Sequence, residues 1–262
     1  MTIHPKATAP ADGPIGGKTR SVYLSLRAEL SSGMRAPGDL LPSEAKLAQS
    51  YGVGRVTVRR ALAALVAEGW VETRAGAGTI VRPPRAAPLS ADISGVLPQL
   101  VEMSEATTAR LLSFAYVEAP APVAAALDLP EGARVQRATR VRLSDGRPFS
   151  HLTTYVPEDL ASGYSEADLA SQPLFRLLER AGIRLGRAEQ SVTATAASPD
   201  VAGVLEVPVG APLLSLSRTV RDGAGRGVER LLALYRPDLF RLDMTLARVD
   251  ASRWQPVIGG AP

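Results

Sequence analysis

The chain has 262 residues, 45% of them hydrophobic and 21% charged, which suits one large domain or two modest ones. It contains no cysteine and only two histidines, and this excludes disulfide scaffolds, thiolate catalysis and zinc sites built on sulfur or on several histidines. No stretch resembles a signal peptide, and no apolar run reaches the roughly 20 residues that span a bilayer. We therefore expect a cytoplasmic protein that needs no membrane and no cofactor.

The charge is distributed unevenly along the chain. Residues 1–85 contain 12 Lys and Arg against 6 Asp and Glu, a net charge of +6, whereas residues 86–262 contain 18 against 20, a net charge of −2. An excess of positive charge at one end indicates a polyanionic partner there. The alternative from charge alone is a basic surface that only meets solvent.

The N-terminal third reads as a tail, three helices and a hairpin. Residues 1–17 are rich in Pro, Gly and Ala without periodicity, which predicts a disordered tail. Apolar spacing and stop signals predict helices over 18–32, 43–52 and 54–68. Alternation around a Gly-rich turn predicts a hairpin over 70–81.

A proline-rich stretch separates this region from a second one. Residues 84–94 are expected to form a linker, because proline removes donors and stiffens the chain. The region 95–250 contains an internal repeat, since the sequence at 123–133 reappears 78 residues later at 201–211. Residues 251–262 are expected to form a C-terminal tail.

The repeat predicts the architecture of the second region. Each copy leads into a strand that carries an arginine at the same offset, Arg140 in one and Arg218 in the other, and then into an Asp-Gly turn at 145–146 or 222–223. A helix is expected between the copies, over 173–181. Two such units side by side would give an α+β domain, an antiparallel sheet with helices packed on it and a cleft between the halves.

The strongest chemical pattern is the run 54–60, Gly-Arg-Val-Thr-Val-Arg-Arg, which opens a helix after a short helix and a tight turn. That is the geometry of a helix-turn-helix, whose second helix enters the major groove. The planar fork of arginine can bond guanine O6 and N7 together, and Thr57 can offer a hydroxyl to a phosphate or base. The alternative is a solvated helix face, which the charge, the hairpin and the preceding helix make less attractive.

Residues 18–83 closely resemble the winged helix-turn-helix of GntR-type transcription regulators. The resemblance is carried by three runs, Pro37-Gly38-Asp39, Leu41-Pro42-Ser43-Glu44 and Tyr51-Gly52-Val53-Gly54-Arg55-Val56-Thr57-Val58-Arg59-Arg60-Ala61-Leu62. Residues 95–250 are similar to the UTRA effector-binding domain, which has a chorismate-lyase-like fold, and the pair is typical of the HutC subfamily.

The resemblance implies a bacterial homodimer, usually a repressor, that binds a double-stranded DNA operator and releases it in response to a small molecule. It also implies a set of DNA-binding residues, with Gly76 at the hairpin tip entering the minor groove: Ser43, Glu44, Arg55, Thr57, Arg59, Arg60 and Gly76. The chain departs from the family at Gly54, where serine is usual.

The same resemblance implies an effector site. Arg140 and Arg142 match a pair that holds the anionic group, and alternate residues of a strand point to one face. The full set of expected effector-binding residues is Arg140, Arg142, His151, Phe175, Glu229 and Tyr235. Phe175 stands where the family often has tyrosine, which favours an acidic, partly apolar metabolite over an amino-sugar phosphate. Purely structural roles for His151 and Tyr235 remain alternatives.

Two other functions stay open at this point. A chorismate-lyase-like enzyme would need only an arginine-lined pocket and an acid, although no activated nucleophile, dyad or metal motif is present in the sequence. An architectural DNA-binding protein without an effector would be favoured if no ligand shifted its thermal midpoint.

Overall fold

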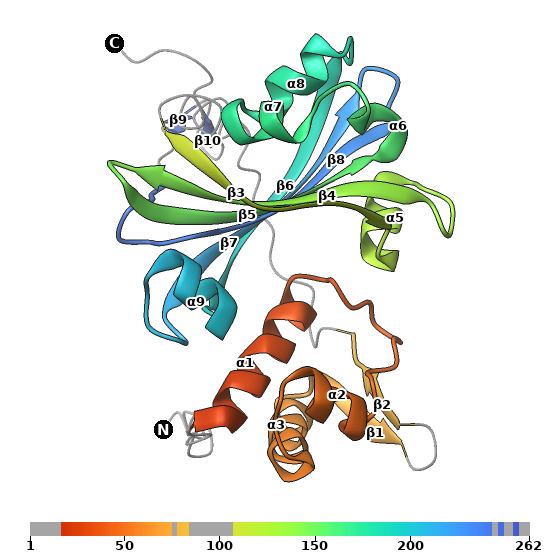
Figure 1. The fold of residues 1–262 in the computed structure, drawn as a ribbon, viewed down its shortest axis with the longest axis vertical. Helices are drawn as coiled ribbons and strands as arrows, with labels where there is room; N and C mark the ends of the chain where they lie inside the picture. The colour runs from red at the N-terminus through yellow and green to blue at the C-terminus, as the bar shows by residue number, and fades with distance from the viewer. Residues whose placement is uncertain (1–16, 75–77, 84–106, 243–245, 249–253, 257–262) are drawn as a thin grey trace.

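The computed structural model describes residues 17–74, 78–83, 107–242, 246–248 and 254–256. The predicted linker at 84–94 and the hairpin tip at 75–77 lie outside these residues, as does most of the N-terminal tail. The N-terminal part has helices α1 (Gly17–Ser31), α2 (Glu44–Ser50) and α3 (Arg55–Ala67), followed by strands β1 (Val71–Arg74) and β2 (Gly78–Val81). Figure 1 shows these elements as a separate layer beside a twisted sheet. The expected order of three helices and a hairpin is confirmed.

Local sequence explains where the short helices begin. The Ser43 hydroxyl accepts from the Lys46 backbone N–H at 3.3 Å and so caps α2, while Glu44 places a negative charge at the positive end of the helix dipole. Gly54 precedes α3 and offers no side-chain cap. The inner face of α3 is buried against α1 and the hairpin, through Val58, Ala61, Leu62 and Leu65.

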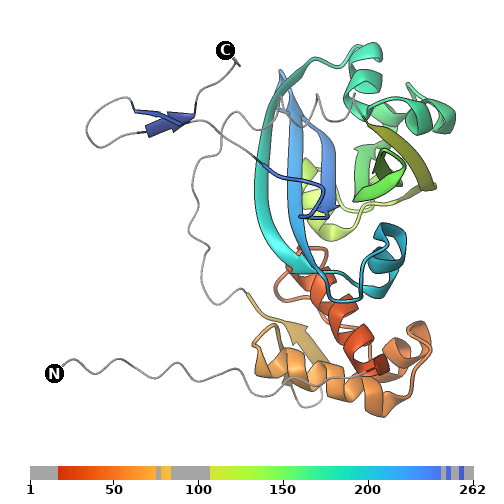
Figure 2. The ribbon, with the colours of Figure 1, turned by 90° about the vertical axis from the view of Figure 1, so that its left-hand side faces the viewer.

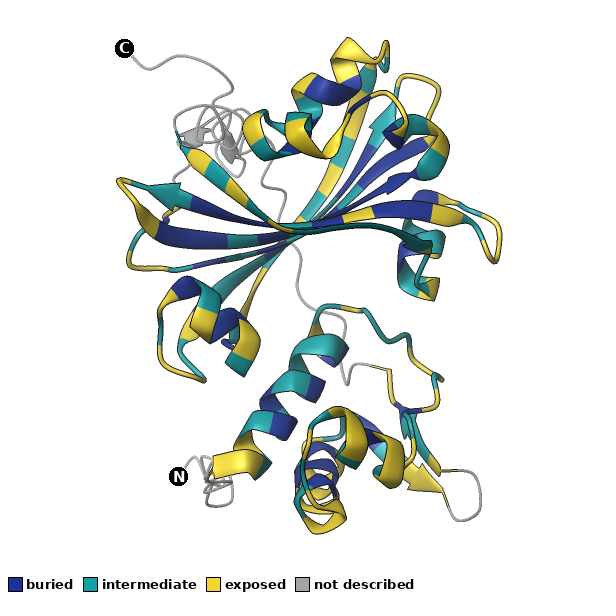
Figure 3. Ribbon diagram, viewed as in Figure 1, coloured by how far each residue is buried: buried dark blue, intermediate teal, exposed yellow. Residues whose placement is uncertain are grey.

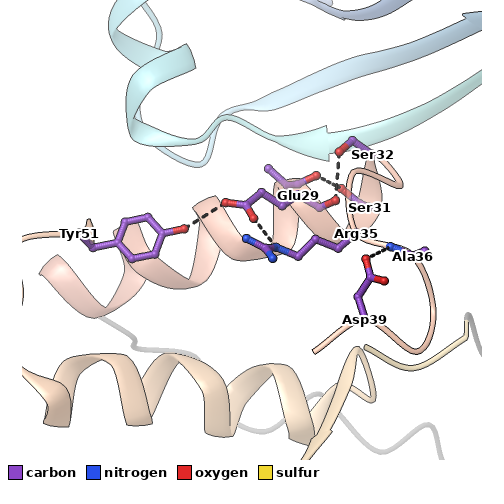
Figure 4. A network of polar contacts seen from close by, with 8 residues as sticks. Glu29, Ser31, Ser32, Arg35, Ala36, Asp39 and Tyr51 are labelled. Atoms are coloured by element: carbon purple, nitrogen blue, oxygen red, sulfur yellow. Dashed lines mark hydrogen bonds and ion pairs between the residues drawn. The ribbon is translucent and has the colours of Figure 1, made fainter. Parts of the chain in front are cut away.

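Polar contacts fasten α1 to the rest of the N-terminal part (Figure 4). Glu29, near the end of α1, accepts from the Tyr51 hydroxyl at 3.2 Å and pairs with Arg35 in the following loop. The Asp39 carboxylate accepts from the Ala36 N–H at 2.7 Å and shapes that loop. These contacts hold the turn before α3 in a defined position relative to α1.

The C-terminal part is one antiparallel sheet with strand order β3-β4-β5-β8-β7-β6. The first half consists of β3 (Thr108–Glu118), α5 (Ala121–Leu127), β4 (Arg134–Ser144) and β5 (Arg147–Pro157). The second half repeats this order with β6 (Leu185–Ala196), α9 (Pro199–Leu205), β7 (Pro212–Asp222) and β8 (Gly227–Tyr235). The two halves meet where β5 pairs with β8. The predicted repeat and the α+β class are confirmed.

The repeat extends to the backbone of the helix ends. Asp128 and Glu206 occupy equivalent positions after α5 and α9, and both adopt left-handed conformations, with φ of 54° and 55°. The hairpins differ. Asp145 and Gly146 form a tight turn in which both have positive φ, whereas the second turn is a longer loop in which Asp222 accepts from the N–H groups of Ala224 and Arg226. Both predicted Asp-Gly pairs therefore stand at a turn between two strands, and the second turn is longer than the first.

Helices cover both faces of the sheet (Figures 1 and 2). The helices α6 (Glu158–Ala161), α7 (Glu166–Ser171) and α8 (Leu174–Arg180) lie on one face, and α5 and α9 lie on the other, with α9 beside α1. Buried residues concentrate in the central strands, as Figure 3 shows. The expected helix over 173–181 is confirmed as α8, whereas α6, α7 and the outer strands β3 and β6 were not foreseen.

The chain also forms a small strand pair after the large sheet. Strand β9 (Leu246–Arg248) pairs with β10 (Trp254–Pro256). Residues 254–256 of the expected C-terminal tail therefore form a strand, and the expected domain limit at 250 falls between two paired strands.

Gly227 and Gly203 give a matched test of how closely helix α5 packs on strand β8. A Cβ on Gly227 would lie 2.7 Å from both Cα and O of Leu127 at the end of α5, so Gly227→Ala must displace backbone and should lower the free energy of unfolding by about 1–3 kcal/mol. Gly203 is an exposed residue within α9, and a Cβ added to it would have no neighbour within 4 Å, so Gly203→Ala should raise that free energy by about 0.5–1 kcal/mol. Urea denaturation of both variants measures the two values, and equal effects would contradict the packing described.

Candidate DNA-binding surface and effector cavity

The start of α3 presents a polar surface away from the core. Arg55, Arg59 and Arg60 are exposed, and Thr57 is half-buried between them. Val56, also in the first turn, is 62% exposed although it is apolar. The turn between α2 and α3 contains Gly52 at φ 58°, a conformation that favours glycine. A short helix, a tight turn and an exposed second helix together form a helix-turn-helix.

An ion pair joins the two helices at this surface. The guanidinium of Arg59 donates to both oxygens of Glu44, from Nε at 3.2 Å and from Nη2 at 2.9 Å. This hydrogen bond lowers the pKa of Glu44 and raises that of Arg59. Both residues were expected at the DNA, but their pairing was not foreseen. Arg59 is therefore oriented before any nucleic acid arrives.

Two other expected DNA-binding residues, Ser43 and Gly76, are not part of this ion pair. Ser43 uses its oxygen to cap α2, which leaves its hydroxyl hydrogen free to be donated elsewhere. Gly76 lies outside the described residues. The arms of its hairpin are paired from Val71 with Val81 to Arg74 with Gly78, so they lead toward the tip side by side.

A cavity of about 370 Å³ lies on the sheet face that carries α6–α8. Five of the six expected effector residues line it together, from strands β4 and β8 and from helix α8: Arg140, Arg142, Phe175, Glu229 and Tyr235. Alternation along each strand explains this convergence, since residues two or six apart on one strand share a face.

The charged groups of this cavity are deeply buried. Arg140 is 4% exposed, and its Nε and Nη1 have no hydrogen-bond partner among the described residues. Burial lowers the pKa of Arg140, while nearby Glu229 opposes that shift. Burial raises the pKa of Glu229, and Arg218 and Arg140 oppose it. A buried charged group without a direct partner lowers the stability of the fold unless a ligand pairs with it.

Arg142 is partnered, in contrast to Arg140. It donates from Nε to the Thr107 hydroxyl at 2.9 Å and from Nη2 to the Thr107 carbonyl at 3.0 Å. Burial and, to a smaller extent, the neighbouring charge of Arg140 lower the pKa of Arg142 to about 10. The two arginines therefore lie close enough to repel each other, which an anion between them would relieve.

The cavity also contains a residue that sequence reasoning did not assign to it. Arg218 on β7 lines the cavity and donates from Nε and Nη2 to Oε1 of Gln190, at 2.9 and 2.7 Å. Its offset from the repeat matches that of Arg140, and this offset was the signal that could have identified it. The pairing confirms the equivalence, since Arg140 lies opposite Leu152 and Arg218 opposite Leu231.

Apolar groups form the remaining walls. Leu152, Leu231 and the half-buried Phe175 line the cavity. Tyr235 is 3% exposed and stacks on Phe240 with ring centroids 4.0 Å apart, so it belongs to a core cluster as well as to the wall. Burial raises the pKa of Tyr235 to about 12. The cavity thus combines an apolar slot with a buried, mostly positive polar lining.

The structure does not bring His151 to this cavity. His151 precedes Leu152 on β5, so it points to the opposite face of the sheet. There it lines a second cavity of about 270 Å³, together with Ser32 of the N-terminal part and Ser215 of β7. Burial lowers the pKa of His151, which favours the neutral ring.

Within the described residues no helix is long and apolar enough to cross a membrane.

Comparisons with known proteins agree with this geometry. Residues 18–81 match the family described as bacterial regulatory proteins of the gntR family, and residues 102–241 match the UTRA domain. The HTH-type transcriptional regulator Rv0792c of Mycobacterium tuberculosis is 31% identical over 86% of this chain and 84% of its own length. The histidine utilization repressor of Pseudomonas putida is 26% identical over 74% of this chain and 78% of its own.

A solved ligand-binding domain, assigned to a GntR-family transcriptional regulator of Bordetella bronchiseptica, is 30% identical and superposes with a TM-score of 0.51. The superposition covers 54% of this chain and 91% of the Bordetella domain. The chain therefore belongs to the GntR family, in its HutC subfamily, and is a DNA-binding transcription regulator with a C-terminal UTRA effector-binding domain.

Proposed function

We propose that this regulator is a homodimeric repressor that holds an operator through α3 and releases it when an anionic metabolite fills the arginine-lined cavity. The observation that carries the effector assignment is Arg140, a buried guanidinium that lines the cavity and has two nitrogens without a partner among the described residues. Such a group is stabilised by an acceptor with negative charge. We assign the cavity to binding and not to catalysis, because the named relatives are regulators.

On the DNA side, we assign direct contacts to Arg55, Thr57, Arg59 and Arg60. Arginine at the start of a helix can reach guanine edges, and the exposed N-terminus of α3 adds N–H groups for a phosphate. Two copies related by a two-fold axis would read two half-sites of a palindromic operator in the bacterial cytoplasm. Gly76 keeps its proposed place in the minor groove.

On the effector side, the lining favours a molecule that joins an acidic group to a partly apolar body. Arg140 and Arg142 would hold the acidic group, and Leu152, Leu231 and Phe175 would contact the rest. Glu229 would accept from a hydroxyl or an ammonium group of the same molecule.

Arg59→Ala tests the recognition helix. Removing the fork should weaken binding to the selected operator by about 10- to 100-fold while weakening non-specific binding much less. Gel shifts at several salt concentrations measure both affinities. Arg134→Ala is the matched control, because Arg134 forms a similar exposed pair with Glu158 in the effector-binding domain. An unchanged operator affinity for Arg59→Ala would contradict the assignment.

Glu44→Gln tests the role of the ion pair between α2 and α3. The change removes a negative charge next to the DNA and leaves Arg59 without its orienting partner, so non-specific binding should tighten while the ratio of specific to non-specific affinity falls severalfold. Fluorescence anisotropy with operator and scrambled duplexes measures this ratio. Glu158→Gln, the matched change in the exposed pair with Arg134, should leave it unaltered.

Arg140→Met tests the effector site through two opposite effects. The change replaces a buried, unpartnered charge by an apolar group of similar length, so the ligand-free protein should be more stable toward heat. The same protein should bind its operator normally but no longer release it when cell extract or an active metabolite is added. Thermal denaturation and operator release measure the two effects. A destabilised protein that still responds would contradict the proposal.

A further inference from the structure

Besides the exposed Arg187, which pairs with Glu189, three more enclosed arginines line the cavity, and they lie on opposite sides of it. Arg140 and Arg142 come from β4, whereas Arg218 comes from β7. Strands β5 and β8 separate these two strands, so the arginine backbones stand about 14 Å apart across the sheet at the usual strand spacing. Leu152 and Leu231 occupy the floor between them.

Glu229 makes a single shared anion an unfavourable explanation for this arrangement. Its side chain is 8% exposed, lies on β8 beside β7, and lines the same cavity. Both Arg140 and Arg218 act electrostatically on it, but within the described part of the chain neither forms an ion pair with it. One compact, multiply charged anion placed near all three of these arginines would also lie close to this carboxylate, which repels it.

The hydrogen bonds of Arg218 prepare it for a ligand of its own. Gln190 accepts from Nε and Nη2, which fixes the plane of the guanidinium and leaves Nη1 available to a ligand in the cavity that Arg218 lines. Arg142 is likewise fixed by Thr107. Each side of the cavity therefore has an oriented arginine, and the apolar floor lies between them.

From this arrangement we infer that the effector is an elongated dianion with one acidic group at each end, bound at Arg140 and Arg142 on one side and at Arg218 on the other. Its middle is apolar where it crosses Leu152 and Leu231, with room for a hydrogen-bond donor to Glu229. This inference rests on the proposed function of the cavity and extends it with a second anion subsite at Arg218.

Pairs of matched acids test the second subsite. Calorimetry on the full-length protein compares glutarate with valerate, adipate with hexanoate and pimelate with heptanoate, so that each pair differs only in whether the far end is a carboxylate or a methyl group. In at least one pair the diacid should bind at least about tenfold more tightly, because a hydrogen bond between charged groups is worth more than this factor.

Three variants locate the effect. Arg218→Gln should abolish the preference for the diacid without changing the affinity for the monoacid, which also shows that the variant is folded. Arg140→Gln should weaken both. Arg230→Gln is the matched control, because Arg230 is a half-buried arginine on the other face of β8 whose Nη1 donates to Thr219 at 3.0 Å; it should behave like the unmodified protein.

The outcomes distinguish the second anion subsite at Arg218 from the anionic cavity as a whole. If monoacids bind and Arg140→Gln removes their binding, but no diacid binds more tightly, the second subsite is wrong and the anionic cavity stands. A diacid preference that survives Arg218→Gln also overturns the second subsite. If no acid binds, or if Arg140→Gln changes nothing, the anionic cavity and the dianion are both wrong.

Discussion

The C-terminal part is organised around positive charge kept in a buried place without a protein partner. Arg140 is almost completely enclosed, two of its nitrogens lack acceptors among the described residues, and Glu229 influences it without forming an ion pair. A domain that had only to be stable would place an apolar side chain there. The fold therefore keeps a buried positive charge that an anionic ligand can pair with. A ligand-controlled switch requires a ligand that binds one state of the protein more tightly than the other.

Alternation along the strands connects this demand to the DNA-binding part. Leu152 faces the arginine-lined cavity, whereas its neighbour His151 faces the second cavity, beside residues of α1. A single layer of backbone thus separates the arginine-lined cavity from the surface on which α1 packs against β6 and α9. A ligand that moves β5, β7 or β8 by a small amount changes both faces at once, because the interior of a sheet is close-packed.

The sequence specified most of the elements that have local signals. Ser43 and Glu44 marked the start of α2, the period of Val58, Ala61, Leu62 and Leu65 marked the inner face of α3, and the repeat predicted the two halves of the sheet. The placement of β3 and β6 at the sheet edges has no such signal, because it depends on pairing between distant strands. The face occupied by His151 depends on a register shift between β4 and β5, and the pairing of Glu44 with Arg59 depends on how α2 packs beside α3; neither has a local signal in the sequence.

The two functional surfaces solve opposite physical problems. At the DNA-binding surface, Arg59 is exposed and already paired with Glu44, so water and salt screen its charge and the protein pays little to present it. In the cavity, Arg140 is enclosed and unpaired, so an incoming anion meets a strong, poorly screened field. An exposed, partnered arginine can exchange acceptors rapidly and search many sequences, whereas a buried, unpartnered one discriminates strongly between an occupied and an empty cavity. The division of labour between a DNA reader and a metabolite sensor follows from where the same side chain is placed.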